Sequence, residues 1–103
     1  MSATRTVKLS RPLETHKGAV PQLELREPKL RCFREYGEPF KVTATKDGQS
    51  IEHDNRVLVK FLSHMSGVDE IILDDLPATD YYAARAALVE MLLGVAGENP
   101  TGT

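Results

Sequence analysis

Apolar and polar residues alternate with a period of two in two stretches near the start of the chain. These stretches are residues 6–10 and residues 22–26, and the alternation places every second side chain on one face of a strand. Between them, residues 15–18 read Thr-His-Lys-Gly and contain the glycine that a tight reversal requires. Residues 6–27 are therefore predicted to form an antiparallel β-hairpin. Pro12 lies inside the first strand, which is therefore expected to be an edge strand or to end there.

Pro28 ends the second strand because it has no N–H to give to the ladder, and it is well suited to open a helix. Leu30 and Phe33 then recur at helical spacing, which predicts a short helix up to Tyr36. Residues 40–45 are β-prone, and Asp47-Gly48 is a strong turn signal. Either a second small hairpin or an extended loop follows from this pattern.

An apolar stripe at helical spacing follows a residue that can cap a helix, either Asp54 or Asn55. The stripe consists of Val57, Leu58, Phe61, Leu62 and Met65. It predicts a helix over residues 54–66, closed by Ser66-Gly67, and a short helical turn is expected between residues 68 and 76.

The last predicted helix runs from about residue 77 or 79 to residue 94, and its apolar arc is unusually wide. The arc covers roughly 200° and is interrupted only by Arg85, whereas a surface helix of a small domain needs about 100°. Either this helix contacts the core on one side and a partner on the other, or it is the central helix of the fold. The candidate partner-binding residues are Tyr81, Tyr82, Arg85, Leu88, Val89, Met91 and Leu92.

These patterns predict an α+β fold, with an N-terminal antiparallel hairpin followed by two to three helices, the longest at the C-terminus. We expect a flexible N-terminus over residues 1–5, a single domain over residues 6–94 and a flexible tail over residues 95–103. The expected core residues are Leu9, Leu23, Leu25, Leu30, Phe33, Leu58, Phe61, Leu62, Leu76, Leu88 and Leu92.

Composition narrows the class of protein. Hydrophobic residues make up 41% and charged residues 27% of the 103 residues, as in ordinary globular proteins, and no apolar run approaches the ~18 residues of a membrane span. Residues 1–50 have a charge balance of +4 and residues 51–103 a balance of −6, so the two halves are expected to attract each other within one chain or between subunits. The basic residues are dispersed and have few aromatic neighbours, which disfavours nucleic-acid binding.

Candidate chemistry is weak. The three histidines and the single cysteine, Cys32, lack the spacing of a metal site, and a single cysteine fits a reducing cytoplasm. Asp74-Asp75 is a carboxylate pair without a positioned base, nucleophile or phosphate-binding loop beside it. We therefore expect no enzyme activity and no cofactor.

Three short motifs stand in a recognisable order. They are Leu25-Arg26-Glu27-Pro28 behind the alternating strand, the stretch Phe61-Leu62-Ser63-His64-Met65-Ser66-Gly67-Val68, and Leu76-Pro77-Ala78-Thr79-Asp80-Tyr81. In this order the chain resembles, over residues 6–94, the tail assembly chaperones of Mu-like and P2-like contractile-tailed bacteriophages. The resemblance implies structural roles for the motif residues Leu25, Arg26, Glu27, Pro28, Gly67 and Asp80. One departure is Arg31-Cys32, where the family usually carries an acidic residue.

The resemblance also implies a function. A chaperone of this family is non-catalytic, binds the tape measure protein, keeps it soluble while the tail tube protein assembles around it, and is absent from the finished virion. It would act in the cytoplasm of the bacterial host, and the tail tube protein and other copies of itself are its further expected partners. The alternative is a small structural adaptor or tail-completion subunit that stays in the virion.

Overall fold

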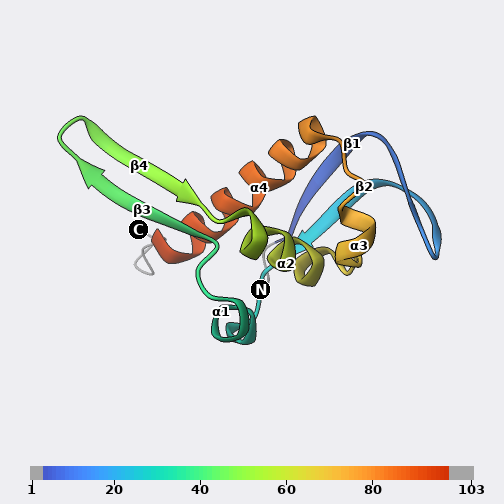
Figure 1. Cartoon of the computed structure of the whole chain (residues 1–103), viewed down its shortest axis with the longest axis horizontal. Helices are drawn as coiled ribbons and strands as arrows, with labels where there is room; N and C mark the ends of the chain where they lie inside the picture. The colour runs from blue at the N-terminus through green and yellow to red at the C-terminus, as the bar shows by residue number, and fades with distance from the viewer. Residues whose placement is uncertain (1–3, 98–103) are drawn as a thin grey trace.

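The computed structural model describes residues 4–97, which form two β-hairpins and four helices (Figure 1). In chain order the elements are β1 (Thr4–Thr15), β2 (Gly18–Arg26), α1 (Leu30–Tyr36), β3 (Phe40–Thr45), β4 (Gly48–His53), α2 (Asn55–Ser66), α3 (Glu70–Leu73) and α4 (Ala78–Gly97). The structure confirms the α+β class, the N-terminal hairpin and the position of the longest helix.

The strands β1 and β2 pair antiparallel, with Val7 opposite Leu23 and both side chains buried. The register shifts between Lys8 and Leu13, where β1 contains more residues than the facing part of β2. This irregularity accommodates Pro12, which cannot donate a ladder hydrogen bond. The first strand is therefore an edge, as predicted, and it continues beyond the proline.

Both hairpins close with the same turn chemistry. The turn Thr15-His16-Lys17-Gly18 and the turn Thr45-Lys46-Asp47-Gly48 each begin with threonine and end with glycine at positive φ, 108° at Gly18 and 131° at Gly48. In each turn the threonine hydroxyl donates to the glycine carbonyl oxygen, at 2.7 and 3.0 Å. Each hairpin turn is thus stabilised by a local hydrogen bond from a side chain to the backbone, between residues only three positions apart in the sequence.

In α1 one prediction is wrong, because Leu30 is 76% exposed and does not belong to the core. The face of α1 that meets the body carries Cys32, Phe33 and Tyr36. At 100° per residue, Leu30 lies roughly 110° from the centre of that face. The ring of Phe33 packs edge-on against Phe61 at a centroid distance of 4.9 Å, which attaches α1 to α2.

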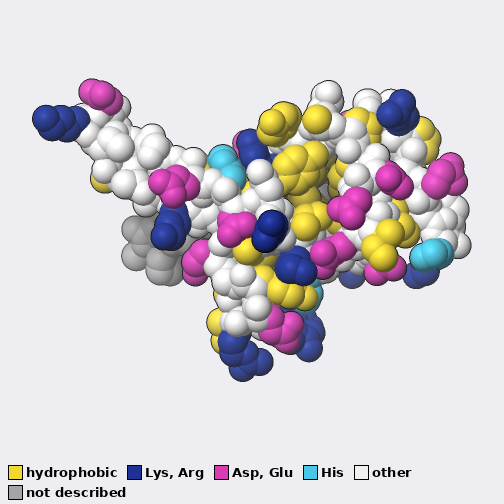
Figure 2. Space-filling model, in the orientation of Figure 1, with side chains coloured by type: hydrophobic (Ala, Val, Ile, Leu, Met, Phe, Trp, Pro, Cys, Tyr) yellow, Lys and Arg dark blue, Asp and Glu magenta, His cyan; other side chains and the backbone are white. Residues whose placement is uncertain are grey.

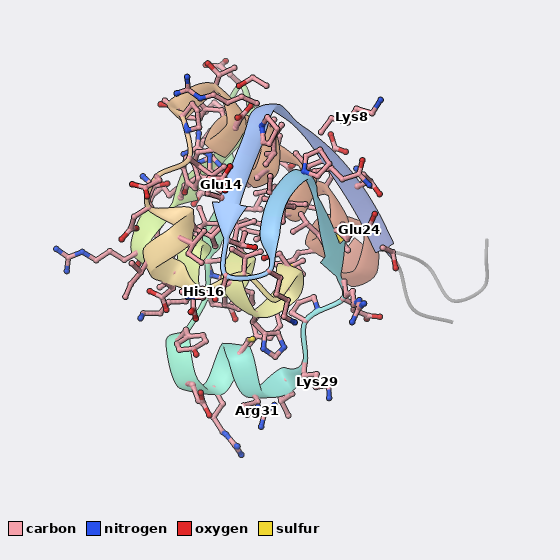
Figure 3. The ribbon with its side chains drawn as sticks, turned by 90° about the vertical axis from the view of Figure 1, so that its right-hand side faces the viewer. Lys8, Glu14, His16, Glu24, Lys29 and Arg31 are labelled. Atoms are coloured by element: carbon pink, nitrogen blue, oxygen red, sulfur yellow. The ribbon has the colours of Figure 1, made fainter. Side chains whose placement is uncertain are left out.

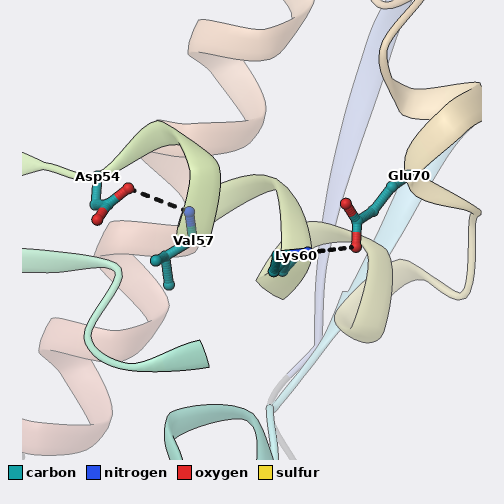
Figure 4. Close-up of polar contacts among 4 residues, drawn as sticks. All are labelled: Asp54, Val57, Lys60 and Glu70. Atoms are coloured by element: carbon teal, nitrogen blue, oxygen red, sulfur yellow. Dashed lines mark hydrogen bonds and ion pairs between the residues drawn. The ribbon is translucent and has the colours of Figure 1, made fainter. Parts of the chain in front are cut away.

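The helix α2 begins and ends as its sequence indicates (Figure 4). The Asp54 carboxylate accepts a hydrogen bond from the backbone N–H of Val57 at 3.3 Å, so Asp54 is the cap. Gly67 ends the helix in the left-handed conformation, with φ 78°. The buried residues of α2 are the predicted Leu58, Phe61, Leu62 and Met65. An exposed ion pair of 3.4 Å between Lys60 and Glu70 links α2 to α3.

The helix α4 packs against β1 and against α2, while α2 packs against β2, so the two helices cover the first hairpin together (Figure 1). Its buried residues and those of β1, β2, α1, α2 and α3 form one hydrophobic cluster. Figure 3 shows the outer side of the first hairpin, where Lys8, Glu14 and Glu24 lie exposed, with helices behind it. Leu9, Phe33 and Leu76, which were expected in the core, are partly buried and pack against its edge.

Asp80, in the first turn of α4, ties this helix to β1. Its side chain is 3% exposed and accepts two hydrogen bonds from Ser10, one from the backbone N–H and one from the hydroxyl, each at 2.9 Å. Ser10 lies in the irregular part of β1, where its N–H is turned to the helix. At a later turn of α4, Arg5 forms a 2.7 Å ion pair with Glu90. The helix is therefore bound to β1 at two places along its length.

The strands β3 and β4 form a second antiparallel hairpin, which settles the choice between a hairpin and a loop. This hairpin projects away from the body (Figure 1). The radius of gyration is 14.4 Å, above the roughly 13 Å of a compact chain of this length, as a projecting element requires. At the ends of the described region, β1 begins at Thr4 and α4 continues to Gly97. The rest of the two predicted flexible termini lies outside the described residues.

Replacement of Asp80 by alanine should lower the free energy of unfolding by about 2–3 kcal/mol, because it removes the two hydrogen bonds that the buried carboxylate accepts from Ser10 and that link α4 to β1. Urea denaturation of the purified protein measures this change. The matched control is Asp75→Ala, since Asp75 is exposed, and its effect should stay within about 0.5 kcal/mol. Equal effects of the two substitutions would contradict the assigned role of Asp80.

Candidate partner-binding surface

The apolar side chains predicted to contact a partner are divided by the structure into two groups. Leu88, Val89, Met91 and Leu92 are between 0% and 8% exposed and belong to the hydrophobic core. They are buried because β1 covers one side of α4 and α2 another, so the chain itself uses most of the wide apolar arc. The structure therefore assigns these four residues to the central helix of the fold.

The other group, Tyr81, Tyr82 and Arg85, forms a cluster at the surface of α4. The guanidinium carbon of Arg85 lies 4.8 Å from the ring centroid of Tyr82 and 5.8 Å from that of Tyr81. The two rings are 6.1 Å apart. Tyr82 is 58% exposed, whereas Tyr81 and Arg85 are half-buried. A guanidinium in contact with aromatic rings holds these side chains in a defined arrangement.

Asn55, the first residue of α2, connects this cluster to a second helix. Its side-chain oxygen accepts hydrogen bonds from the Tyr81 hydroxyl at 2.7 Å and from Arg85 Nη1 at 3.2 Å. Burial raises the pKa of Tyr81 above its ordinary value of 10.0, and the charge of Arg85 opposes this in part. The phenol therefore keeps the proton that it donates to Asn55. Burial, and then the charge of Arg85, lower the pKa of His53 below 6.5.

Beside the cluster lies a shallow hollow of about 420 Å³. It is lined by Asn55, Arg56, Val59, Leu73, Asp74, Leu76, Ala78 and Tyr81, which come from α2, from the end of α3 and its following turn, and from the start of α4. Figure 2 shows apolar side chains gathered over the N-terminal half of α4 next to α2. An open apolar hollow with an aromatic and arginine border is suited to protein recognition.

The residues of the Leu25-Arg26-Glu27-Pro28 motif contribute to the fold. Leu25 is fully buried near the end of β2, and Pro28 is half-buried where the chain turns into α1. Arg26 and Glu27 are exposed. The motif therefore ends the sheet on a core residue and directs the chain into the next helix.

The remaining two motif residues each have a defined structural contact. Gly67 adopts positive φ, and its N–H donates to the carbonyl oxygen of Ser63 at 2.8 Å. Asp80 accepts from Ser10, as described above. Neither residue belongs to the surface cluster.

The described residues offer little support for a reactive thiol, a metal site or a membrane span. Burial raises the pKa of the Cys32 thiol, which favours the unreactive protonated form. Within residues 4–97, no three or more His, Cys, Asp and Glu side chains are grouped as a metal site. No helix in the described part of the chain is both long and apolar enough to cross a membrane.

Sequence reasoning missed the contribution of α2 and α3 to the surface. Asn55 was only a candidate cap of its own helix, Val59 lies outside the apolar stripe of that helix, and Leu73 and Leu76 belong to a separate short turn. Their meeting with Tyr81 depends on how three elements cross. No periodicity within one element could have revealed it.

A family model matches most of the chain. The family model described as "Phage tail assembly chaperone proteins, E, or 41 or 14" matches residues 6–93, which include every element of the fold except the ends of β1 and α4. Comparison with curated proteins and with solved structures found no match.

The titration of Tyr81 provides a test of the cluster. Ultraviolet absorbance during an alkaline titration should show a tyrosine that ionises above pH 10.0, and Tyr81→Phe should remove this component. The neutral phenol is favoured in the folded state, so its contribution to stability is complete below pH 10.0 and is lost as the pH rises through the raised pKa. The control Tyr82→Phe should keep the late component. If Tyr82→Phe removed the late component, its assignment to Tyr81 would be contradicted.

Proposed function

Because the chain belongs to the phage tail assembly chaperone family, we propose that it binds the tape measure protein and keeps it soluble during tail tube assembly. A tape measure protein is a long helical rod whose apolar stripes are uncovered until the tube surrounds it. Uncovered stripes of this kind aggregate. A small protein that covers these stripes until the tube forms would prevent the aggregation.

The observation that carries the proposal is the exposed cluster of Tyr81, Tyr82 and Arg85 beside the apolar hollow. Large aromatic side chains and arginine supply most of the binding energy in many protein interfaces. Asn55 holds Tyr81 and Arg85 by hydrogen bonds in the free protein, and the Arg85 guanidinium contacts the ring of Tyr82. A partner therefore loses little free energy in ordering them.

The form of the hollow fits a helical partner that must later be released. The hollow is open, and it lies between the starts of two helices, α2 and α4. An amphipathic helix can place two or three apolar side chains in such a hollow while its polar face stays in water. The limited area keeps the contact reversible, so that the tail tube protein can displace the chaperone.

In this function the protein is a non-catalytic partner that acts in the host cytoplasm and leaves before the virion is complete. Mass spectrometry of purified virions tests the last point against the adaptor alternative. A chaperone should be missing from the particles. Its presence in stoichiometric amounts would favour a structural subunit.

Tyr82→Ser should weaken binding to the tape measure protein roughly 10- to 100-fold, because truncation of an exposed aromatic side chain at the border of the hollow removes much of the binding energy. The measurement is co-expression with the tape measure protein of the same gene cluster, followed by a binding titration of the purified proteins. Since Tyr82 is 58% exposed, the fold should be retained, which circular dichroism verifies.

The matched control is Leu30→Ser, which removes an even more exposed apolar side chain, at 76%, from α1. This variant should bind like the unmodified protein. If both variants bind normally, the surface is assigned wrongly while the function stands. If the unmodified protein neither binds nor solubilises the tape measure protein, the proposed function itself fails.

A further inference from the structure

The β3–β4 hairpin, called the arm below, is the most exposed element of the described chain. Every residue from 41 to 53 is exposed, and the arm extends away from the body (Figure 1). Its two strands pair along their whole length, from Phe40 opposite His53 to Thr45 opposite Gly48. A lone two-stranded ribbon is marginally stable in water. We therefore expect the arm to be stabilised by contact with a partner.

The arm has one apolar and one polar face. Phe40, Val42 and Ala44 share a face with Ile51, which lies directly opposite Val42. Val42 is 41% and Ile51 38% exposed, so this face is not covered within the monomer. The other face carries Lys41, Thr43, Thr45, Ser50 and Glu52.

A groove of about 530 Å³ lies where the arm joins the body. Six consecutive residues, 38–43, line it, together with Pro28, Phe33, Leu92 and Leu93 of the body. Consecutive residues alternate between the two faces of a strand, so it is the edge of β3 that borders the groove. A strand edge offers backbone N–H and C=O groups to a further strand.

We propose that the occupant of this groove is the arm of a second copy of the chain, with the two β3 strands pairing antiparallel across a two-fold axis. Centred on Thr43, this pairing places Val42 of one copy opposite Ala44 of the other, and Phe40 opposite Lys46. The tip of each arm then enters the groove at the base of the other arm. Such an interface is isologous, since both copies use the same surface.

The charges of the arm favour this pairing. Its base carries Glu38 and Lys41, and its tip carries Lys46 and Asp47. Glu38 precedes β3, and Lys46 and Asp47 form the turn that follows it. The antiparallel pairing brings the tip of one arm beside the base of the other, and so Lys46 beside the second copy's Glu38. The same arrangement brings Asp47 beside the second copy's Lys41. Each dimer thus contains four complementary pairs.

The pairing would also stabilise the arm, which is only marginally stable as a lone two-stranded ribbon. It creates a four-stranded sheet in the order β4–β3–β3–β4, and sheets of three or more strands with an apolar face are stable units. The groove lies at the C-terminal end of α4, near Leu92. Tyr81 lies eleven residues earlier, about 16 Å along the helix, so the dimer leaves the candidate partner-binding surface free.

Sedimentation velocity of the purified full chain over a range of micromolar concentrations tests the proposal. The unmodified protein should be a dimer in equilibrium with monomer. Val42→Asp should weaken the dimer roughly 100-fold, because it places two carboxylates near the centre of the new sheet. The control Ile71→Asp, at a side chain of α3 that is 80% exposed, should leave the dimer unchanged.

A charge exchange tests the register. Glu38→Lys and Lys46→Glu should each weaken the dimer roughly tenfold at low salt, since each turns two attractions into repulsions. The double variant should restore the dimer, and Lys17→Glu, at the tip of the other hairpin, is the control. A monomeric unmodified protein would overturn the proposal, even if Val42→Asp then impairs tape measure binding. The proposal would also be overturned if the arm variants left the dimer dissociation constant unchanged, or if the double variant did not restore it.

Discussion

The structure depends on the coverage of α4 by its own chain on two sides. Leu88, at the centre of this helix, is fully buried between the elements that pack around it, and β1 and α2 supply the contacts. Asp80 fixes the helix along its axis, because a carboxylate that is 3% exposed must find its donors, and Ser10 provides both. The position of α4 is therefore fixed, and each of its ends can contribute to a separate surface of the protein.

The two ends of α4 differ in what surrounds them. At the N-terminal end, Tyr81, Tyr82 and Arg85 meet the start of α2, and the hollow beside them is open. At the C-terminal end, Leu92 and Leu93 form one wall of the groove along β3. A buried central helix thus separates two apolar surfaces that different partners could occupy at the same time. In the proposed function, such separation would allow several copies to bind one tape measure protein together.

Much of the local structure was predictable because short-range chemistry determines it. The threonine and glycine of each turn, the Asp54 cap and the glycine at position 67 act within a few residues of the chain. The prediction for Leu30 was wrong for a related reason. Helical spacing shows which residues share a face, but in a helix of only two turns it does not show which face is buried. The crossing of α1 over Phe61 decided that.

The sequence by itself determined the order and type of the elements, the α+β class and the family, since periodicity, caps, turns and short motifs are properties of neighbouring residues. It also revealed that α4 has more apolar surface than one contact needs. Only the tertiary structure decided what that surface meets: Leu88, Val89, Met91 and Leu92 are buried by β1 and α2, and Tyr81, Tyr82 and Arg85 stay at the surface with Asn55. The physical reason is that burial depends on contacts between residues far apart in the chain, such as Ser10 and Asp80, and no single helix or strand contains that information.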